Sequence, residues 1–248
     1  MGQPLAPADV AATAHVYVER LDDTIQIVGV DGHHLVRVRR LRAGEVVTAA
    51  DGYGRWRTYS VDAVEGGVVA LHATSDFAHE VQLVPRLTVA CALTKGERPE
   101  LVVQKLTELG ADTIVLVQAA RSVVRWDVGR ELTVMDRLHR IAREAGAQCR
   151  RARLPVIDGP LRLAELAGRT GLVLADRDGV PADLLPEPPG GEWLVVVGPE
   201  GGLDESELEL FTNAPRLAVG RLVLRAETAA IAAAAALASR RSAPSGVS

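Results

Sequence analysis

Alternation of apolar and polar positions predicts β-structure in the first third of the chain. Short apolar segments are separated there by turn signals at Asp31-Gly32, Asp51-Gly52 and Gly66-Gly67. This spacing favours a small barrel or half-barrel of antiparallel strands. The expected strands are residues 15–18, 25–28, 46–49, 57–64 and 68–72. Apolar positions 35, 38 and 41 within residues 32–42 predict one short helix with a basic flank.

The pattern changes to alternating strands and helices from Leu87 onward. Buried strands are expected at residues 87–93, 113–118, 172–175, 193–197 and 216–219. Helices are expected from about residue 100 to 109, at 132–149, after Asp204 and at 227–239, and the tail from Arg240 is expected to fray. Asp204 and Glu207 have the spacing of a capping box. The chain therefore divides into residues 1–76 and an α/β domain of residues 77–248 with a parallel sheet.

Bulk composition is that of a globular protein without a membrane anchor. The 248 residues are 48% hydrophobic and 24% charged, and no apolar run is long enough to cross a bilayer. The N-terminus shows no export signal, which favours a cytoplasmic location. Cys91 and Cys149 lie far apart without metal-ligand spacing, so we expect reduced thiols, no disulfide and no metal site.

Basic residues are clustered although the formal net charge is −4. Nine arginines fall between Arg121 and Arg153, and a second cluster consists of Arg37, Arg39, Arg40 and Arg42. Almost every basic residue is arginine, which suits bidentate phosphate contacts and base stacking. A codon bias toward arginine explains that choice but not the clustering. The distribution allows a basic face for nucleic acid on an otherwise acidic protein.

Two glycine-containing loops near the C-terminus are the most informative feature of the sequence. Each follows an apolar strand and precedes a helix, in Val195–Leu203 and in Leu217–Ala229. Loops of this kind meet at the carboxyl edge of a parallel sheet, where α/β proteins bind small ligands. Glycines let the backbone approach such a ligand closely. The first strand of the domain lacks a dinucleotide-binding glycine fingerprint, and no Walker A sequence is present, so the order is not that of a Rossmann fold.

At these residues the chain resembles the RsmE-type 16S rRNA (uracil-N3) methyltransferases of the SPOUT superfamily. The shared motifs, spread over most of the chain, are Asp31–Leu35, Val38–Gly44, Gln104–Gly110, Ala120–Val123, Ile141–Ala145 with Gln148 and Arg151, Val197–Gly202 and Leu224–Ala229. Each motif is weak alone, and their combination in this order is specific. The chain departs from the family where His15 precedes Val16-Tyr17 and where Leu138 follows Arg137, positions that bear on RNA contacts or helix packing.

The resemblance implies a fold, a cofactor and partners. The fold is an α/β domain with a SPOUT-type parallel sheet and a C-terminal trefoil knot, preceded by a small PUA-like β-barrel that helps to bind RNA. The implied methyl donor is S-adenosylmethionine, and the implied acceptor is N3 of a uridine in 16S rRNA, on the 30S ribosomal subunit. A homodimer is implied as well, with no membrane and no metal ion as partners.

The site residues follow from these motifs. Arg225 is expected to stabilise negative charge on the target base, and Glu200 and Glu227 are candidates for ordering the loops or accepting a proton. The expected cofactor residues are Leu174, Val197, Gly198, Glu200, Gly201, Gly202, Leu217, Gly220, Leu222, Leu224, Thr228 and Ala229. The expected RNA-facing residues are Arg37, Arg39, Arg40, Arg42, Arg121, Arg125, Arg143, Arg150 and Arg151.

Other interpretations stay open at this stage. For Leu217, Leu222 and Leu224, an ordinary position in the hydrophobic core is as good an explanation as a cofactor contact. For Arg225 and Glu227, a structural ion pair is an alternative to a catalytic role. A SPOUT enzyme acting on another base or on a ribose 2′-hydroxyl would use the same donor loops. A catalytically silent RNA-binding or ribosome-assembly factor would be expected to have damaged loops, whereas Gly198, Gly201, Gly202 and Gly220 are all present.

Overall fold

The computed structural model describes residues 6–92, 98–122 and 128–244, and the side chains of 128–130 are not considered. The described residues form two compact units. The first contains the chain up to Val81 together with Arg143–Leu154, and the second contains Gln82–Ala142 and the chain from Pro155 onward. The sequence placed the division after residue 76 and assigned Arg143–Leu154 to the second domain. Leu93 and Arg125, which both belong to predicted features, lie outside the described residues.

A mixed six-stranded sheet forms the first unit. Its strands pair in the order β1-β3-β4-β5-β2, with β6 added to β4. The elements are β1 (Ala14–Tyr17), β2 (Thr24–Ile27), α1 (Gly29–Arg37), β3 (Val46–Ala50), β4 (Arg55–Glu65), β5 (Val68–Ala73) and β6 (Ala78–His79). The prediction of purely antiparallel pairing was wrong for β1, which pairs with β3 in parallel. In the described part of the chain this path does not join β1 to β2, so closure into a barrel stays a prediction.

Helix α1 begins and ends earlier than its apolar positions predicted. It spans Gly29–Arg37, and Val38 is exposed whereas Leu41 is buried beyond the helix end. Arg40 adopts a left-handed backbone with φ of +54°, and the Leu41 amide donates to the Leu35 carbonyl at 3.2 Å. A left-handed residue followed by such a bond is a common helix termination. The chain reversal therefore returns Leu41 to the core.

The second unit is built on a six-stranded parallel sheet of order β12-β10-β11-β7-β8-β9. Its elements are β7 (Arg86–Ala92), α2 (Arg98–Glu108), β8 (Thr113–Gln118), β9 (Val156–Arg162), β10 (Leu172–Val180), β11 (Glu192–Val197), α4 (Glu205–Glu209), β12 (Arg216–Leu217) and α5 (Ala226–Ala238). Helix α3 (Val128–Cys149) begins in this unit and ends in the first. Strand β9 was not predicted because Gly159-Pro160 signals a turn, but proline is tolerated on the edge strand that β9 forms.

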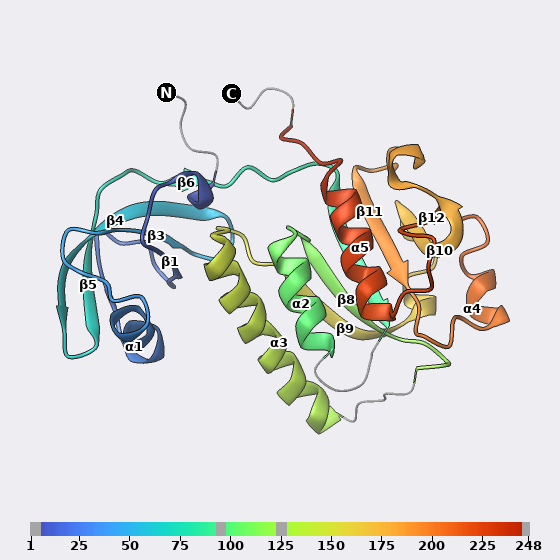
Figure 1. Ribbon diagram of the computed structural model, residues 1–248, viewed down its shortest axis with the longest axis horizontal. Coiled ribbons are helices and arrows are strands. Elements are labelled where there is room, and N and C mark those ends of the chain that lie inside the picture. Colours follow the sequence, from blue (N-terminus) through green and yellow to red (C-terminus); the bar gives the residue numbers. More distant parts are fainter. Residues whose placement is uncertain (1–5, 93–97, 123–127, 245–248) are drawn as a thin grey trace. The chain divides into compact units, whose positions relative to one another are not determined.

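The central strands are buried on both faces, as a covered parallel sheet requires. Leu87 and Val89 of β7 pack into a core shared with α2 and α5, whereas the alternate residues Ala90 and Ala92 pack into a second core on the other face. Helices α2 and α5 lie side by side over one face of the sheet (Figure 1). The alanines of α5 allow this close approach, with Ala230, Ala233 and Ala234 fully buried. Asp204 caps α4 with Glu207 in a capping box.

The segment that follows α5 is anchored, contrary to the prediction of a frayed tail from Arg240. The Arg240 guanidinium lies 4.8 Å from the centre of the Trp193 ring and donates to the Leu185 carbonyl at 2.9 Å. Arg241 forms an ion pair with Asp112, and the two side chains are 3% and 6% exposed. These contacts tie Arg240 and Arg241 to β11 and to the residue before β8.

The C-terminal end of α3 is fixed to β1 in the first unit by a buried histidine. His15 Nδ1 lies 2.9 Å from Thr48 Oγ1, and His15 Nε2 lies 3.0 Å from the Arg151 carbonyl. Tyr17 Oη donates to the same carbonyl at 2.6 Å. Burial lowers the pKa of His15 to about 4. The departure from the family at position 15 is thus an interior contact rather than an exposed RNA contact.

We expect His15 to destabilise the protein in acid. The pKa of His15 is about 4 in the folded chain, against 6.5 for an unperturbed histidine, so the unfolded chain takes up a proton first and stability falls between pH 6.5 and pH 4. The loss attributable to His15 approaches about 3 kcal/mol at pH 4. Urea unfolding of wild type and His15→Gln at both pH values measures it. Glu80, whose raised pKa acts in the opposite direction, contributes equally to both proteins. Parallel pH curves for the two would contradict the assignment.

Candidate functional site

Both glycine-containing loops border one cavity at the carboxyl edge of the parallel sheet. The cavity measures about 360 Å³ and is lined by the end of β10, the loop after β11 and the segment between β12 and α5. In the sheet, β10 lies between β11 and β12, so its final residues form one side of the cavity. A crevice beyond the carboxyl ends of parallel strands is the usual ligand site of α/β proteins.

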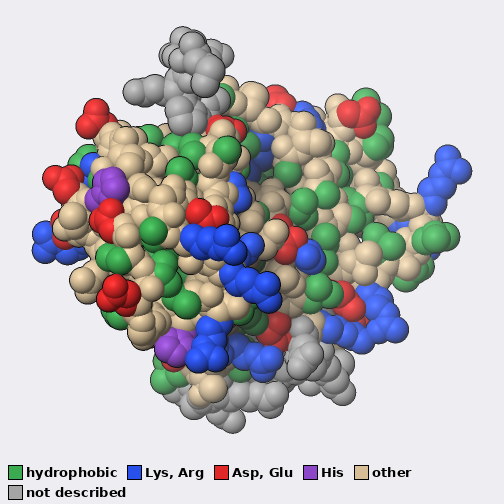
Figure 2. All heavy atoms as spheres, turned by 60° about the vertical axis from the view of Figure 1, so that its left-hand side comes forward, with side chains coloured by type: hydrophobic (Ala, Val, Ile, Leu, Met, Phe, Trp, Pro, Cys, Tyr) green, Lys and Arg blue, Asp and Glu red, His purple; other side chains and the backbone are tan. Residues whose placement is uncertain are grey.

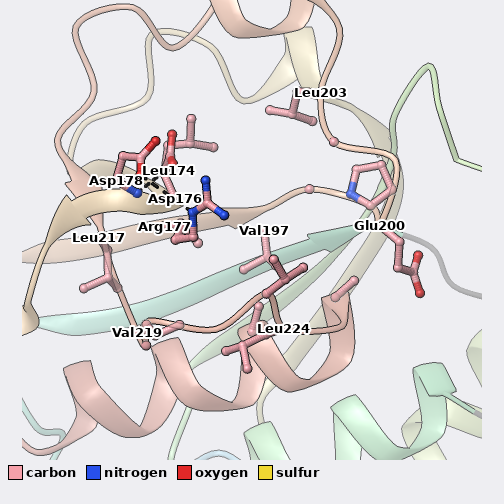
Figure 3. A pocket seen from close by; sticks show the side chains of 18 of the residues that line it. Leu174, Asp176, Arg177, Asp178, Val197, Glu200, Leu203, Leu217, Val219 and Leu224 are labelled. Atoms are coloured by element: carbon pink, nitrogen blue, oxygen red, sulfur yellow. Dashed lines mark hydrogen bonds and ion pairs between the residues drawn. The ribbon is translucent and has the colours of Figure 1, made fainter.

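Part of the cavity lining is apolar. Figure 3 shows Leu174, Val197, Leu217 and Leu224 around it, and the first three are nearly or fully buried. Leu222 also lines the cavity but is 78% exposed. Apolar walls combined with backbone groups at their ends suit a heteroaromatic ring. A ligand in the cavity would also remove part of the exposed apolar surface from water.

Ten of the twelve predicted cofactor residues line this cavity. They are Leu174, Val197, Gly198, Glu200, Gly202, Leu217, Gly220, Leu222, Leu224 and Ala229. Gly201 and Thr228 are not among the lining residues. The Gly201 carbonyl instead accepts a hydrogen bond from Arg121 Nη1 at 3.0 Å, and Thr228 is exposed on the first turn of α5.

An acidic group on β10 also lines the cavity and was not predicted. Asp176 and Asp178 flank Arg177 where β10 continues beyond the expected end at Ala175. Figure 3 shows the three on one side of the cavity, with Glu200 on the other. Asp176 forms an ion pair with Arg216 of β12. Arg177 Nε lies 3.7 Å from Asp178 Oδ1, so both carboxylates have a cationic partner in the protein. Charged residues directly after an apolar parallel strand were the signal available in the sequence.

The predicted catalytic carboxylates are joined by an arginine that the sequence did not single out. Arg98 Nη1 lies 2.7 Å from Glu200 Oε1, and Arg98 Nε lies 3.5 Å from Glu227 Oε1. Arg98 is the first residue of α2, so it connects this helix to the loop after β11 and to the first turn of α5. The ion-pair alternative is therefore realised for Glu227, but with Arg98 as its partner. Arg225 occupies the N-cap position of α5, and its side chain is exposed.

Glu227 retains an acceptor that the fold does not use. The residue is 9% exposed, and its Oε2 atom has no hydrogen-bond partner among the described residues. A buried carboxylate oxygen without a donor is costly for stability. Such an atom is available to a ligand or to a transferred proton.

Comparison with known proteins places the chain in a family. Residues 82–238 match the family described as RNA methyltransferase domain, and residues 29–65 match the RNA methyltransferase PUA domain. The chain is 38% identical over 232 residues to the ribosomal RNA small subunit methyltransferase E of Mycobacterium bovis, with 88% of each chain covered. The chain therefore belongs to the family of ribosomal RNA small subunit methyltransferase E. The Bacillus subtilis member is 30% identical over 231 residues, covering 86% of this chain and 89% of the relative.

A solved structure of similar fold contains a bound donor. The chain resembles a putative methyltransferase from Legionella pneumophila in complex with the cofactor SAM, with a TM-score of 0.78 and 27% identity. The similarity covers 91% of this chain and 97% of that one. The cavity described above therefore belongs to an RNA methyltransferase fold.

In this member of the family, the predicted RNA-facing arginines fall into two groups. Arg37, Arg39, Arg40 and Arg42 are exposed at the end of α1 and in the following loop, and Arg121 is exposed beside Gly201. Arg150 and Arg151 instead point into the first unit. Arg150 donates to the carbonyls of Val10 and Ala12, and Arg151 is only 9% exposed. We therefore remove these two from the proposed RNA contacts, because their guanidinium groups are engaged or covered.

Arg143 is intermediate between these groups. It donates to the Tyr17 carbonyl at 2.7 Å and lies over the Tyr17 ring, yet its side chain remains 44% exposed. On the face shown in Figure 2, Lys and Arg side chains are mixed with Asp and Glu. On this face the basic side chains therefore do not form one uninterrupted patch. Among the described residues no helix could cross a membrane, and no group of three potential metal ligands is gathered.

We expect Arg98→Met to lower the free energy of unfolding by about 1–2 kcal/mol, because it leaves the buried Glu227 carboxylate without a cation. Partial exposure of Arg98 keeps the figure below that of a fully buried pair. Urea unfolding of Arg98→Met, Glu227→Gln and the double variant measures the coupling. The double variant should lose less than the sum of the single losses. Strict additivity would show that the pair contributes nothing.

Proposed function

We propose that this protein is an S-adenosylmethionine-dependent methyltransferase that methylates N3 of a uridine in 16S rRNA on the assembled 30S subunit. The single observation behind the proposal is the cavity between the two glycine loops, in a chain whose family members are named ribosomal RNA small subunit methyltransferase E. The N3 position and the 30S substrate rest on the resemblance of the whole set of motifs to the RsmE-type family, because the two donor loops alone would serve another base or a ribose 2′-hydroxyl equally well.

The cavity has the size and chemistry that the donor requires. Its volume of about 360 Å³ is within the usual range for small-ligand pockets. Leu217, Leu222 and Leu224 would cover the adenine, and the backbone at Gly198, Gly202 and Gly220 would approach the ribose and adenine edges. When bound, S-adenosylmethionine supplies a methyl group activated by its sulfonium.

The protein's own groups must position the uracil and accommodate its lost proton. Arg225 projects from the N-terminus of α5 beside the loop that lines the cavity, where it can stabilise negative charge on the base. Glu227 is the candidate acceptor for the N3 proton, because its buried Oε2 atom has no hydrogen-bond partner among the described residues. Arg98 holds Glu200 and Glu227 in place and so acts as a positioning residue. Methyl transfer would form the bond between N3 and the methyl group, break the sulfur–methyl bond of the donor and move the N3 proton to the acceptor.

Five further properties belong to the same proposal. The segment from β11 to α5 would form the trefoil knot of the SPOUT fold, and the first unit would close into a PUA-like barrel. A homodimer is proposed, and exposed Leu222 and Val223 beside the cavity are apolar surface that such an assembly could cover. RNA would contact Arg37, Arg39, Arg40, Arg42, Arg121 and Arg143, with Arg125 outside the described residues. We also propose a cytoplasmic location.

Methyl transfer from labelled S-adenosylmethionine to 30S subunits lacking native modification tests the function. Mass spectrometry of the digested rRNA should detect 3-methyluridine at one site. A 2′-O-methylated nucleoside or a different methylated base would keep the donor site but overturn the proposed acceptor atom. If the protein binds the donor and methylates free rRNA but not 30S subunits, the assembled subunit is not its substrate. Neither binding nor transfer would favour a silent RNA-binding factor.

A further inference from the structure

Two exposed aromatic side chains lie just before β4 and just before its partner strand β6 in the first unit. The sequence holds eight Phe, Trp and Tyr residues. Among those described, Tyr53 is 82% exposed and Phe77 is 48% exposed, whereas the other described aromatics are buried. Tyr53 precedes β4, and Phe77 precedes β6, the strand that pairs with β4. We call Tyr53, Arg55, Phe77 and His79 the β4–β6 platform.

Strand register places these side chains on the outer face of the sheet. Arg55 pairs with His79 and Trp56 pairs with Ala78 in antiparallel register. Trp56 is 1% exposed and points into a small core. Because side chains alternate between faces, Arg55 and His79 must point outward. The Arg55 guanidinium lies 4.6 Å from the centre of the Phe77 ring, so a cation and an aromatic ring are stacked in a solvent-exposed position.

Arg57, a buried residue two positions after Arg55 on β4, contacts the same ring. Arg57 is 7% exposed, forms an ion pair with Asp23 and donates to the Ser75 carbonyl at 3.0 Å. Its guanidinium also lies 4.6 Å from the Phe77 ring centre. Phe77 is therefore held by two guanidinium groups, of which Arg55 is exposed and Arg57 is structural.

The turn that presents Tyr53 is rigidly built although its side chain is exposed. Asp51 Oδ1 accepts from the amides of Tyr53 at 2.7 Å and Arg55 at 3.1 Å. Gly54, with φ of +110°, lies so close to Arg153 that an added Cβ would come within 2.5 Å of Nη2. The turn is thus ordered before any partner arrives, which reduces the entropy lost on binding. Arg153 supplies a further cation beside the turn.

We propose that the β4–β6 platform binds single-stranded RNA, with Tyr53 and Phe77 stacking on unpaired bases and Arg55 and Arg153 contacting phosphates. Aromatic rings beside cations are the chemistry of single-strand recognition, since every base offers a face for stacking. Cations accompany both rings, because Arg55 lies over Phe77 and Arg153 lies beside the turn that carries Tyr53. This inference rests on the proposed RNA substrate and adds a site distinct from the arginines after α1.

Binding of a fluorescently labelled single-stranded oligouridylate to the full-length protein, followed by anisotropy, tests the platform without requiring catalysis. Tyr53→Ala and Phe77→Ala should each weaken binding about fivefold or more, and Tyr53→Phe should retain wild-type affinity because it keeps the ring. Val30→Ala, which removes an exposed apolar side chain elsewhere in the same unit, is the matched control. Thermal unfolding of each variant confirms that the protein remains folded.

The salt dependence of binding separates the two kinds of contact. Arg55→Ala and Arg153→Ala should each reduce the slope of log affinity against log salt by about 0.7, whereas Tyr53→Ala should leave it unchanged. Unchanged RNA affinity for Tyr53→Ala and Phe77→Ala together would overturn the proposal. If wild type transfers no methyl group but the aromatic variants still lose RNA binding, the proposed reaction fails and the platform stands.

Discussion

Replacing Asp112 by alanine is expected to lower the free energy of unfolding by about 3–5 kcal/mol, because it leaves the buried Arg241 guanidinium without its carboxylate. The Asp112 and Arg241 side chains are 6% and 3% exposed, and their Oδ2 and Nη2 atoms lie 2.5 Å apart. Asp112 Oδ2 also accepts from the Leu87 amide at 2.8 Å. One substitution thus removes an ion pair and a backbone contact at the start of β7.

Urea unfolding of wild type and Asp112→Ala measures this loss. Asp183→Ala is the matched control, since Asp183 is an exposed carboxylate of the same unit. The double variant Asp112→Asn/Arg241→Met should be more stable than the sum of its single losses predicts, because neither charge is then buried alone. A loss below about 1 kcal/mol for Asp112→Ala would mean that the pair behaves like a surface ion pair.

Arg225→Ala is expected to lower the rate of methyl transfer by about 10²–10³-fold, the usual effect of removing a donor that stabilises developing negative charge. Arg225 is exposed and does not line the cavity, so the dissociation constant for S-adenosylmethionine should change little. Arg225→Lys keeps the charge but loses the bidentate geometry, and an intermediate rate is expected. Single-turnover transfer and calorimetric donor binding measure the two quantities separately.

Arg221→Ala is the control for Arg225, because it removes an exposed arginine from the same segment between β12 and α5. It should retain a rate close to that of wild type. If Arg225→Ala weakens donor binding as much as it slows transfer, Arg225 orders the cofactor loop rather than stabilising the base. If neither quantity changes, Arg225 has no part in the reaction.

Local patterns predicted much of the fold because their causes are local. Alternation and apolar runs located most strands, and the Asp204 capping box was correctly identified from its spacing. Where a long-range partner determined the outcome, the local pattern was insufficient. Strand β9 pairs along β8 despite its Gly159-Pro160 signal, and β1 pairs in parallel with β3. Arg240 and Arg241 are anchored by residues about 50–160 positions earlier in the chain.

The candidate site shows the same division. Glycines after apolar strands were sufficient to identify the loops, since parallel strands present their carboxyl ends at a shared edge. Ten predicted residues accordingly line one cavity. The sequence did not reveal that β10 lies between β11 and β12, and so it missed Asp176 and Asp178. The order of strands in a sheet depends on packing between distant segments rather than on local periodicity.

By itself, the sequence determined the α/β organisation of the second unit, the two glycine loops and the residue types available for chemistry. Only the tertiary structure decided how the charges are paired. It joined Glu200 and Glu227 through Arg98, and it turned Arg150 and Arg151 inward. The physical reason is that the position of a charged residue in the sequence does not reveal which group its side chain will contact. Whether it meets solvent, a ligand or an opposite charge depends on which elements fold against it.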